Sequence, residues 1–80
     1  MIPLYAFVRG DTLGLVVLAD EDETVASVAS RLQAAASLRV AIRPCVRVLV
    51  EGREASPDAT MASLGIRPLD RIDLIPAEEA

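Results

Sequence analysis

The sequence predicts an α+β domain built from five strands and one main helix. Five segments carry apolar residues in short blocks or in alternation, whereas one segment repeats them at helical spacing. The chain has 80 residues, so residues 1–80 are expected to form a single domain with one core. Hydrophobic residues make up 52% of the chain with only one Tyr and one Phe, which predicts an aliphatic core.

The first half predicts a β-hairpin followed by the helix. Residues 4–9 and 13–19 are apolar and are separated by Gly10 and Asp11, which favour a turn. Thr24 is the expected N-cap of the helix, and the acids that precede it favour the positive end of the helix dipole. The helix should end near Ser37. Its apolar residues follow i, i+3, i+4, i+7 spacing and are Val25, Val28, Ala29, Leu32 and Ala36.

The second half predicts three more strands. Residues 46–50 (VRVLV) are rich in β-branched residues and end at a Glu-Gly turn, and residues 53–55 can form a short edge strand. Thr60 can cap a single helical turn through Leu64, which Gly65 can end in a left-handed conformation. Residues 67–70 form a turn into the last strand, residues 71–75, which Pro76 should stop.

No residue is predicted to be catalytic, to bind a cofactor or to ligate a metal. The chain contains no His, the most common general base near neutral pH and the most common metal ligand. Cys45 is the only cysteine and stands between Pro44 and a valine-rich strand, so we interpret it as a small buried hydrophobe rather than a nucleophile. The serines lie in no nucleophile-elbow context, and the glycines form no phosphate-binding loop.

Charge and hydropathy limit the partners and the compartment. The net charge is −4, and the eight Arg residues are interspersed with twelve acids, which argues against nucleic acid and against an anionic membrane surface. The first residues lack a basic signal-peptide region, and no apolar run reaches the roughly 18 residues of a membrane span. With a single cysteine, the chain is expected to be cytoplasmic.

Two stretches resemble a known superfold. The stretch VRVLVEGREASPDATMASLGIRPLDRIDLI, from Val46 onward, resembles the second half of a ubiquitin-like β-grasp domain, and ETVASVASRL resembles its first helix. This resemblance implies a mixed five-stranded sheet with one main helix and a short helical turn. Ubiquitin-type transfer is not expected, because the chain has no flexible tail ending in two glycines.

Within that superfold the chain resembles the small B component, or gamma subunit, of bacterial toluene monooxygenase hydroxylases. The segments that carry this likeness are IPLYAFVRGD, LVVLADEDETVASVA, VRVLVEG and TMASLGIRPLDRIDL. The resemblance implies a non-catalytic subunit that docks on a larger di-iron subunit and supports its assembly, in a complex that oxidises aromatic hydrocarbons with O₂. It implies no small-molecule ligand for this chain.

The strand pattern predicts a docking surface on the sheet. One helix can cover only one face, and the residues of the third and fifth strands that alternate with the inward set should point away from it. The first strand could direct either Tyr5 and Phe7 or its aliphatic residues outward, while the second strand is apolar on both sides. Some apolar surface must therefore stay uncovered. The expected partner interface is Arg47, Leu49, Arg71, Asp73 and Ile75.

Two other functions stay open at this point. The first alternative is a free-standing bacterial ubiquitin-like adapter, for example of a secretion system. The second, more remote, is an enzyme that acts through Cys45. Neighbouring genes would distinguish the monooxygenase subunit from the adapter, and alkylation of Cys45 would test the enzyme.

Overall fold

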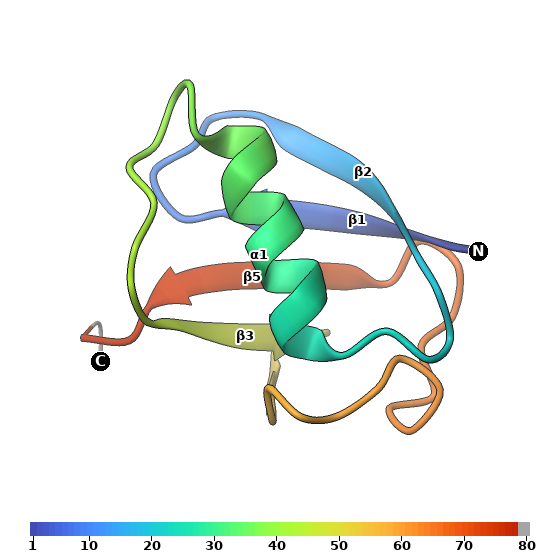
Figure 1. The fold of residues 1–80 in the computed structure, drawn as a ribbon. Helices are drawn as coiled ribbons and strands as arrows, with labels where there is room; N and C mark the ends of the chain where they lie inside the picture. The colour runs from blue at the N-terminus through green and yellow to red at the C-terminus, as the bar shows by residue number, and fades with distance from the viewer. Residues whose placement is uncertain (79–80) are drawn as a thin grey trace.

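The computed structural model describes residues 1–78 and consists of one sheet with a helix across one of its faces (Figure 1). Within these residues no helix has the length and apolarity of a transmembrane span. The elements are β1 Ile2–Val8, β2 Gly14–Ala19, α1 Val25–Ala36, β3 Val46–Val50, β4 Arg53–Ala55 and β5 Arg71–Pro76.

The strands lie in the order β2-β1-β5-β3-β4. β1 and β5 are parallel at the centre, and the other neighbours are antiparallel, so the sheet is mixed as expected. The parallel pair needs a long crossover connection, and α1 provides it on the inner face of the sheet. β2 and β4 are the edge strands, and this leaves the outer face of the sheet without a covering helix in the described residues.

The core lies between α1 and the inner face of the sheet. Leu4 and Ala6 of β1 are fully buried, which settles the orientation of that strand and directs Tyr5 and Phe7 outward. Met61, from the connection before β5, is also fully buried. The other buried core residues include all five apolar helix positions named from the sequence, together with Val48, Ile72 and Leu74.

The helix begins and ends where the sequence predicted. Thr24 has extended backbone angles, and its Oγ1 accepts a hydrogen bond from the Ser27 N–H at 3.2 Å, as an N-cap does. Ser37 is the C-cap, and its N–H donates to the Ala34 carbonyl. The predictions for the third and fourth strands match the observed bounds. The first strand starts two residues earlier and ends one residue earlier than predicted, and the second starts one residue later.

Four turns contain a residue with positive φ, the first of them at Gly10 after β1. Glu51 and Gly52 both have positive φ, which suits the two-residue hairpin loop between β3 and β4. Gly65 ends the short turn that starts at Thr60, with φ +65° as predicted. Leu69, in the turn before β5, has φ +66° although it carries a side chain, and its neighbour Pro68 occupies the position before it.

Pro76 differs from its predicted role. It belongs to β5 and pairs with Val46, and the next residue, Ala77, donates its N–H to the Cys45 carbonyl at 3.1 Å. A proline is tolerated here because it is the last residue of the strand, where a missing N–H interrupts little of the ladder.

Candidate docking surface

The outer face of the sheet divides into an apolar half and a charged half. Alternation along each strand places the apolar half on β1 and β2, where Tyr5, Val16 and Leu18 expose 46%, 65% and 49% of their surface. In the β1–β2 register Tyr5 is directly opposite Val16, and Pro3 is opposite Leu18. Cross-strand partners are neighbours on one face, so these side chains form a continuous apolar patch. We call Tyr5, Val16 and Leu18 the apolar patch.

The aromatic pair is held against the backbone of β2. The rings of Tyr5 and Phe7 lie 4.9 Å apart at 56° to each other. Gly14 is opposite Phe7, and a Cβ placed on Gly14 would lie 2.9 Å from Tyr5 Cε1 and 3.1 Å from Phe7 Cε1. Only a residue without a side chain leaves the rings this space. Glycine at position 14 therefore shapes the apolar half of the face.

Arg71 joins the two halves. Its guanidinium carbon lies 4.2 Å from the centre of the Phe7 ring, which is cation–π geometry, and its Nε contacts Asp73 Oδ2 at 3.0 Å. The Asp73 carboxylate, through a side-chain hydrogen bond, raises the pKa of Arg71 above its ordinary value. The backbone N–H of Arg71 also donates to Glu51 Oε2 at 2.6 Å. This cation is therefore fixed in place and satisfied before any partner arrives.

The charged half continues on β3 and β4. Arg47 Nη2 contacts Glu54 Oε1 at 2.8 Å, and this pairing raises the pKa of Arg47. Leu49 is half-buried and lies between Asp73 of β5 and Glu54 of β4 in the strand registers. Both ion pairs keep substantial solvent exposure, so each contributes little to stability. Their effect is to present matched charges around a single aliphatic side chain.

Four of the five residues expected at the interface lie on the outer face with partial or full exposure, but Ile75 does not fit the expectation. It has outward parity on β5, yet only 7% of its surface is exposed. Its neighbours include Arg47, opposite in the β3–β5 register, and Arg9, which lines the same two surface hollows. Long arginine side chains can shield an aliphatic residue along their stems, so Ile75 lies beneath the surface rather than on it.

The residues of the apolar patch were not predicted from the sequence as an interface. The one signal that the sequence carries is that the second strand is apolar on both sides. That signal was not enough because the orientation of β1, and with it the position of Tyr5, depends on packing against α1. Without that orientation, an exposed Val16 or Leu18 is only a scattered surface hydrophobe.

The exposure of Cys45 also differs from the prediction. Cys45 was expected to be buried, but it is exposed. It precedes β3 and lies outside the core between α1 and the sheet. It lines a groove of about 620 Å³ between the helix and the segment before β3, where the Gln33 amide bonds the Arg43 backbone in both directions, at 3.2 and 2.7 Å.

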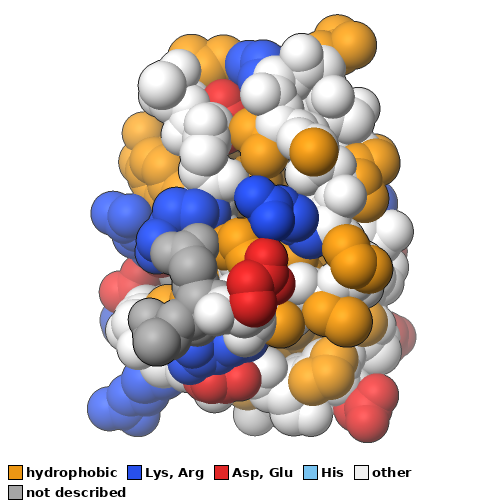
Figure 2. Space-filling view, turned by 90° about the vertical axis from the view of Figure 1, so that its left-hand side faces the viewer, with side chains coloured by type: hydrophobic (Ala, Val, Ile, Leu, Met, Phe, Trp, Pro, Cys, Tyr) orange, Lys and Arg blue, Asp and Glu red, His pale blue; other side chains and the backbone are white. Residues whose placement is uncertain are grey.

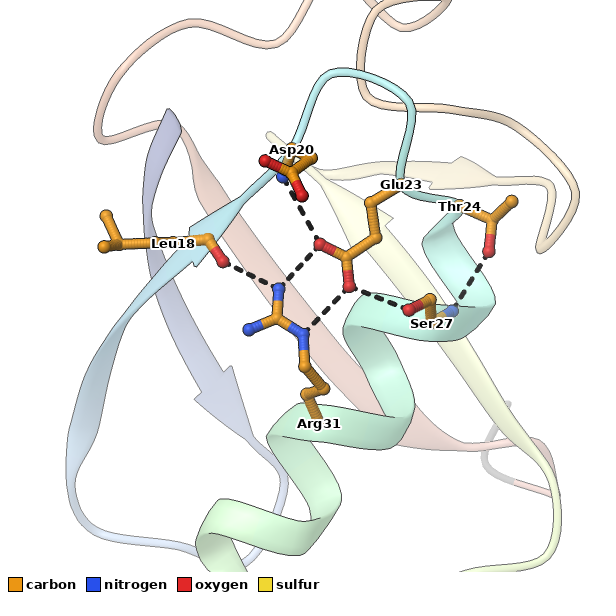
Figure 3. Close-up of polar contacts among 6 residues, drawn as sticks. All are labelled: Leu18, Asp20, Glu23, Thr24, Ser27 and Arg31. Carbon is orange, nitrogen blue, oxygen red and sulfur yellow. Dashed lines mark hydrogen bonds and ion pairs between the residues drawn. The ribbon is translucent and has the colours of Figure 1, made fainter. Parts of the chain in front are cut away.

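The acidic run before α1 is tied to the helix by one arginine (Figure 3). Arg31 Nε and Nη2 donate to the two carboxylate oxygens of Glu23 at 2.8 and 2.7 Å, and Nη2 also donates to the Leu18 carbonyl at 2.7 Å. Glu23 additionally accepts from the Ser27 hydroxyl at 2.7 Å. The Arg31 guanidinium is the main cause that lowers the pKa of Glu23. Residues 1–78 contain no group of three or more potential ligand side chains placed to hold a metal ion.

Charged side chains also pair at the end of the molecule that carries the hairpin turn and the segment after α1. Figure 2 views this end and shows basic and acidic side chains close together, with hydrophobic side chains at both borders of the view. Arg39 binds Asp11, and Arg43 Nη1 contacts Glu78 Oε1 at 3.1 Å. Of these ions, Asp11 is the least accessible, with 1% of its side chain exposed.

Comparison with solved structures agrees with this architecture. The chain is similar to a chain of the structure described as toluene 4 monooxygenase HD complex with inhibitor 4-bromobenzoate, with 27% identity, a TM-score of 0.83, and 91% of this chain and 94% of that chain covered. It is also similar to Caldiarchaeum subterraneum ubiquitin, with 21% identity and a TM-score of 0.78 over 99% of this chain and 96% of that chain.

A ubiquitin-like domain from Arabidopsis thaliana matches with 18% identity and a TM-score of 0.74 over 98% of this chain and 79% of that one. The two ubiquitin-like structures show the fold alone, and they confirm the expected ubiquitin-like β-grasp. A comparison with curated protein sequences gave no match.

A family comparison agrees with the structural one. The model of the family described as Toluene-4-monooxygenase system protein B (TmoB) matches residues 1–75. This match spans every strand and the helix, up to the last residue but one of β5. The resemblance inferred from the sequence is thereby confirmed, and the chain belongs to the family of Toluene-4-monooxygenase system protein B.

Proposed function

We propose that this chain is the small, non-catalytic gamma subunit of a multicomponent di-iron monooxygenase hydroxylase that oxidises aromatic hydrocarbons. It docks on the larger di-iron subunit and supports assembly of the complex. Family membership and the 27% identity to a chain of the toluene 4 monooxygenase complex support this proposal. The same similarity favours it over a free-standing adapter, because the ubiquitin-like structures share only the fold.

The observation that carries the proposal is the uncovered outer face of the sheet. The helix shelters the inner face, whereas Tyr5, Val16 and Leu18 remain exposed side by side on the outer face. A continuous apolar surface with charges around it is typical of a surface that a partner covers. Burial of roughly 800 Å² on each partner is ordinary for a stable complex.

The apolar patch would form the centre of the interface and the charged half its rim. Arg47, Arg71 and Asp73 are paired within the chain, so they can meet a partner without leaving an isolated buried charge. Leu49 would be the apolar contact within that rim. Ile75 would support the surface from beneath, since its side chain is already buried.

A non-catalytic role agrees with the chemistry of the described residues. The chain has no His, and Cys45 has no hydrogen-bonding base among residues 1–78. The acid with the most elaborate polar environment, Glu23, is engaged by Arg31 and Ser27 at the start of the helix. These contacts serve local structure at the start of α1.

The proposal is tested by co-purification with the larger hydroxylase subunit of a toluene monooxygenase complex. Leu49→Asp would place a third carboxylate between Asp73 and Glu54, and we expect at least about a tenfold loss of affinity with the fold retained. Leu38→Asp is the matched control, because Leu38 is 94% exposed and lies after the helix, away from the sheet face. Wild-type yield of the complex with Leu49→Asp would contradict the charged half as an interface. Failure of the unsubstituted chain to bind would contradict the function itself.

A further inference from the structure

The free edge of β2 lacks most of the features that usually protect an edge strand. β2, residues Gly14–Ala19 (GLVVLA), contains no charged residue and no proline, and within residues 1–78 its only sheet neighbour is β1. Edge strands in monomeric proteins are normally protected by charges, proline or bulges, because their unpaired N–H and C=O groups can pair with another chain. Figure 1 shows β2 at the border of the sheet with no further strand beside it.

The register shows which backbone groups point to this edge. The Tyr5 N–H donates to the Asp70 carbonyl, and the Pro3 carbonyl accepts from the Leu69 N–H, so these β1 residues direct their polar groups away from β2. The alternate residues of β1 must then bond β2, and antiparallel alternation leaves every second residue of β2 directed to the free edge. The residues of β2 directed to the free edge are Gly14, Val16 and Leu18.

A side-chain contact supports this assignment independently. Arg31 Nη2 reaches the Leu18 carbonyl at 2.7 Å from α1, which is possible only if that carbonyl does not face β1 (Figure 3). Arg31 thus occupies one acceptor at one end of the edge. The N–H and C=O of Val16 stay directed outward at its middle, beyond the last strand of the sheet.

Side chains around this edge suit an extended apolar segment. Val16 and Leu18 expose 65% and 49% of their surface on the outer face, and Leu15 and Val17 are half-buried on the inner face. A strand added here would therefore meet apolar surface on both of its sides. The same edge adjoins the apolar patch, so a partner that covers the patch also reaches the edge.

The charges at the two ends of β2 differ. Asp20, Glu21 and Asp22 follow β2 and are exposed, and no ion pair is formed by their side chains among the described residues. Arg31 at this end is paired with Glu23 and also attracts Asp20, so the three acids outnumber the one cation. At the other end, Asp11 is neutralised by Arg39. One end of the edge is therefore strongly acidic and the other is not, which favours a strand with a cationic residue at one end.

We propose that an extended segment of the partner subunit adds to β2 as a sixth strand, with apolar side chains along it and a Lys or Arg beside Asp20 to Asp22. Strand addition of this kind gains affinity from main-chain hydrogen bonds and specificity from the alternating side chains. The proposal rests on the proposed function, because the strand belongs to the hydroxylase. A second copy of this chain fits less well, since each copy carries a net charge of −4 and has no unmatched positive end on β2.

Amide hydrogen exchange on the full chain, alone and in complex with the larger hydroxylase subunit, tests this pairing directly. The Val16 N–H faces solvent in the free chain and should exchange at least about tenfold more slowly in the complex. A complex that forms while Val16 keeps its free-chain rate would overturn strand addition and leave the proposed function standing. No complex at all would overturn both.

Two substitutions separate backbone pairing from side-chain contact. Val16→Pro removes an N–H that β1 does not use, so the fold should persist while affinity for the hydroxylase falls at least about tenfold. Val16→Thr keeps the N–H and nearly the same shape, so it reports the loss of the apolar side-chain contact alone and should weaken the complex at least about threefold less than Val16→Pro does. Equal affinities for the two variants would overturn the proposal. If Val16→Pro does not fold, the exchange measurement decides.

The charge requirement has its own test. Asp20→Asn with Asp22→Asn should weaken the complex about three- to tenfold at low salt and reduce its dependence on salt. Serine substitutions at Thr12 and Leu13, at the other end of β2, should have little effect on the salt dependence. Self-association of the isolated chain, abolished by Val16→Pro, would instead show that a second copy occupies the edge, and would overturn the proposed partner.

Discussion

Arg39 binds Asp11 through two parallel hydrogen bonds, from Nε to Oδ1 and from Nη2 to Oδ2, both 2.9 Å long. The pair joins the turn between β1 and β2 to the segment that follows α1. Asp11 also accepts from the Leu13 N–H at 3.2 Å, so one carboxylate organises both its own turn and the contact with the helix end. A bidentate pair with this geometry is more specific than an ordinary surface ion pair.

This pair predicts a loss of stability in acid. The Arg39 guanidinium, through its hydrogen bonds, is the main cause that lowers the pKa of Asp11 in the folded chain. A carboxyl whose folded pKa is depressed stabilises the fold above its unfolded pKa, and this stabilisation is lost as pH falls through the folded value. We therefore expect the free energy of unfolding to decrease below about pH 4.

Asp11→Asn should lower the stability at pH 7 and make its decrease in acid shallower. Urea unfolding at pH 7 and at pH 3 measures both effects. Asp58→Asn is the control, because Asp58 is exposed and forms no ion pair among the described residues. An Asp11→Asn variant with the same pH dependence as the control variant would contradict the prediction.

Leu69→Gly should stabilise the fold. Leu69 has φ +66° and 63% of its surface is exposed, so the side chain strains the backbone and contributes little packing. Removing the left-handed penalty gains about 1–2 kcal/mol, and the entropy of glycine in the unfolded chain costs about 0.4–1 kcal/mol. The expected net gain is about 0.5–1 kcal/mol. Leu69→Ala removes the same contacts but keeps the strain, and equal stability of the two variants would contradict this explanation.

Met61→Ala should be among the most destabilising single changes outside the helix. Met61 is fully buried, and its N–H donates to the Glu23 carbonyl while its carbonyl accepts from the Ile66 N–H. Truncation of a buried methionine typically costs about 2–5 kcal/mol. Leu64→Ala, from the same turn but 37% exposed, should cost less than half as much. Thermal and urea unfolding compare them, and similar losses would show that Met61 is not the anchor of this connection.

Cys45 should react with a thiol reagent in the folded state. It is exposed and lies on an open groove, so labelling needs no unfolding. We expect one equivalent of Ellman's reagent to react at nearly the same rate with and without denaturant. A large acceleration by urea would restore the buried position that the sequence suggested. Cys45→Ser should leave assembly with the hydroxylase unchanged, since the proposed interface is on the opposite face of the sheet.

The sequence was most informative where local chemistry decides the structure. The helix spacing from Val25, the cap at Thr24 and the valine-rich third strand act within a few residues, and the structure has them where they were expected. The positive φ of Gly65 was predicted for the same reason. Membership of the family was also evident, because its motifs extend over most of the chain.

Properties that depend on contacts between distant segments were not predicted. The burial of Met61 needs its docking against the start of the helix, and it follows no periodic pattern in the sequence. Arg39 and Asp11 are 28 residues apart, and neither residue suggests the other from the sequence. Ile75 has the predicted strand parity but is shielded by its neighbours, which parity cannot reveal. Prediction of the apolar patch would have required the orientation of β1, which depends on packing against α1.

Gly14 has a consequence beyond its own strand. Because position 14 carries only a hydrogen atom, the phenol of Tyr5 and the benzene ring of Phe7 can lie close to the backbone of β2. The surface topography of this part of the sheet thus depends on a residue that has no side chain with which to contact a partner. A methyl group added at position 14 would displace both rings. It would thereby reduce the shape complementarity between this face and another subunit without replacing any residue that contacts that subunit.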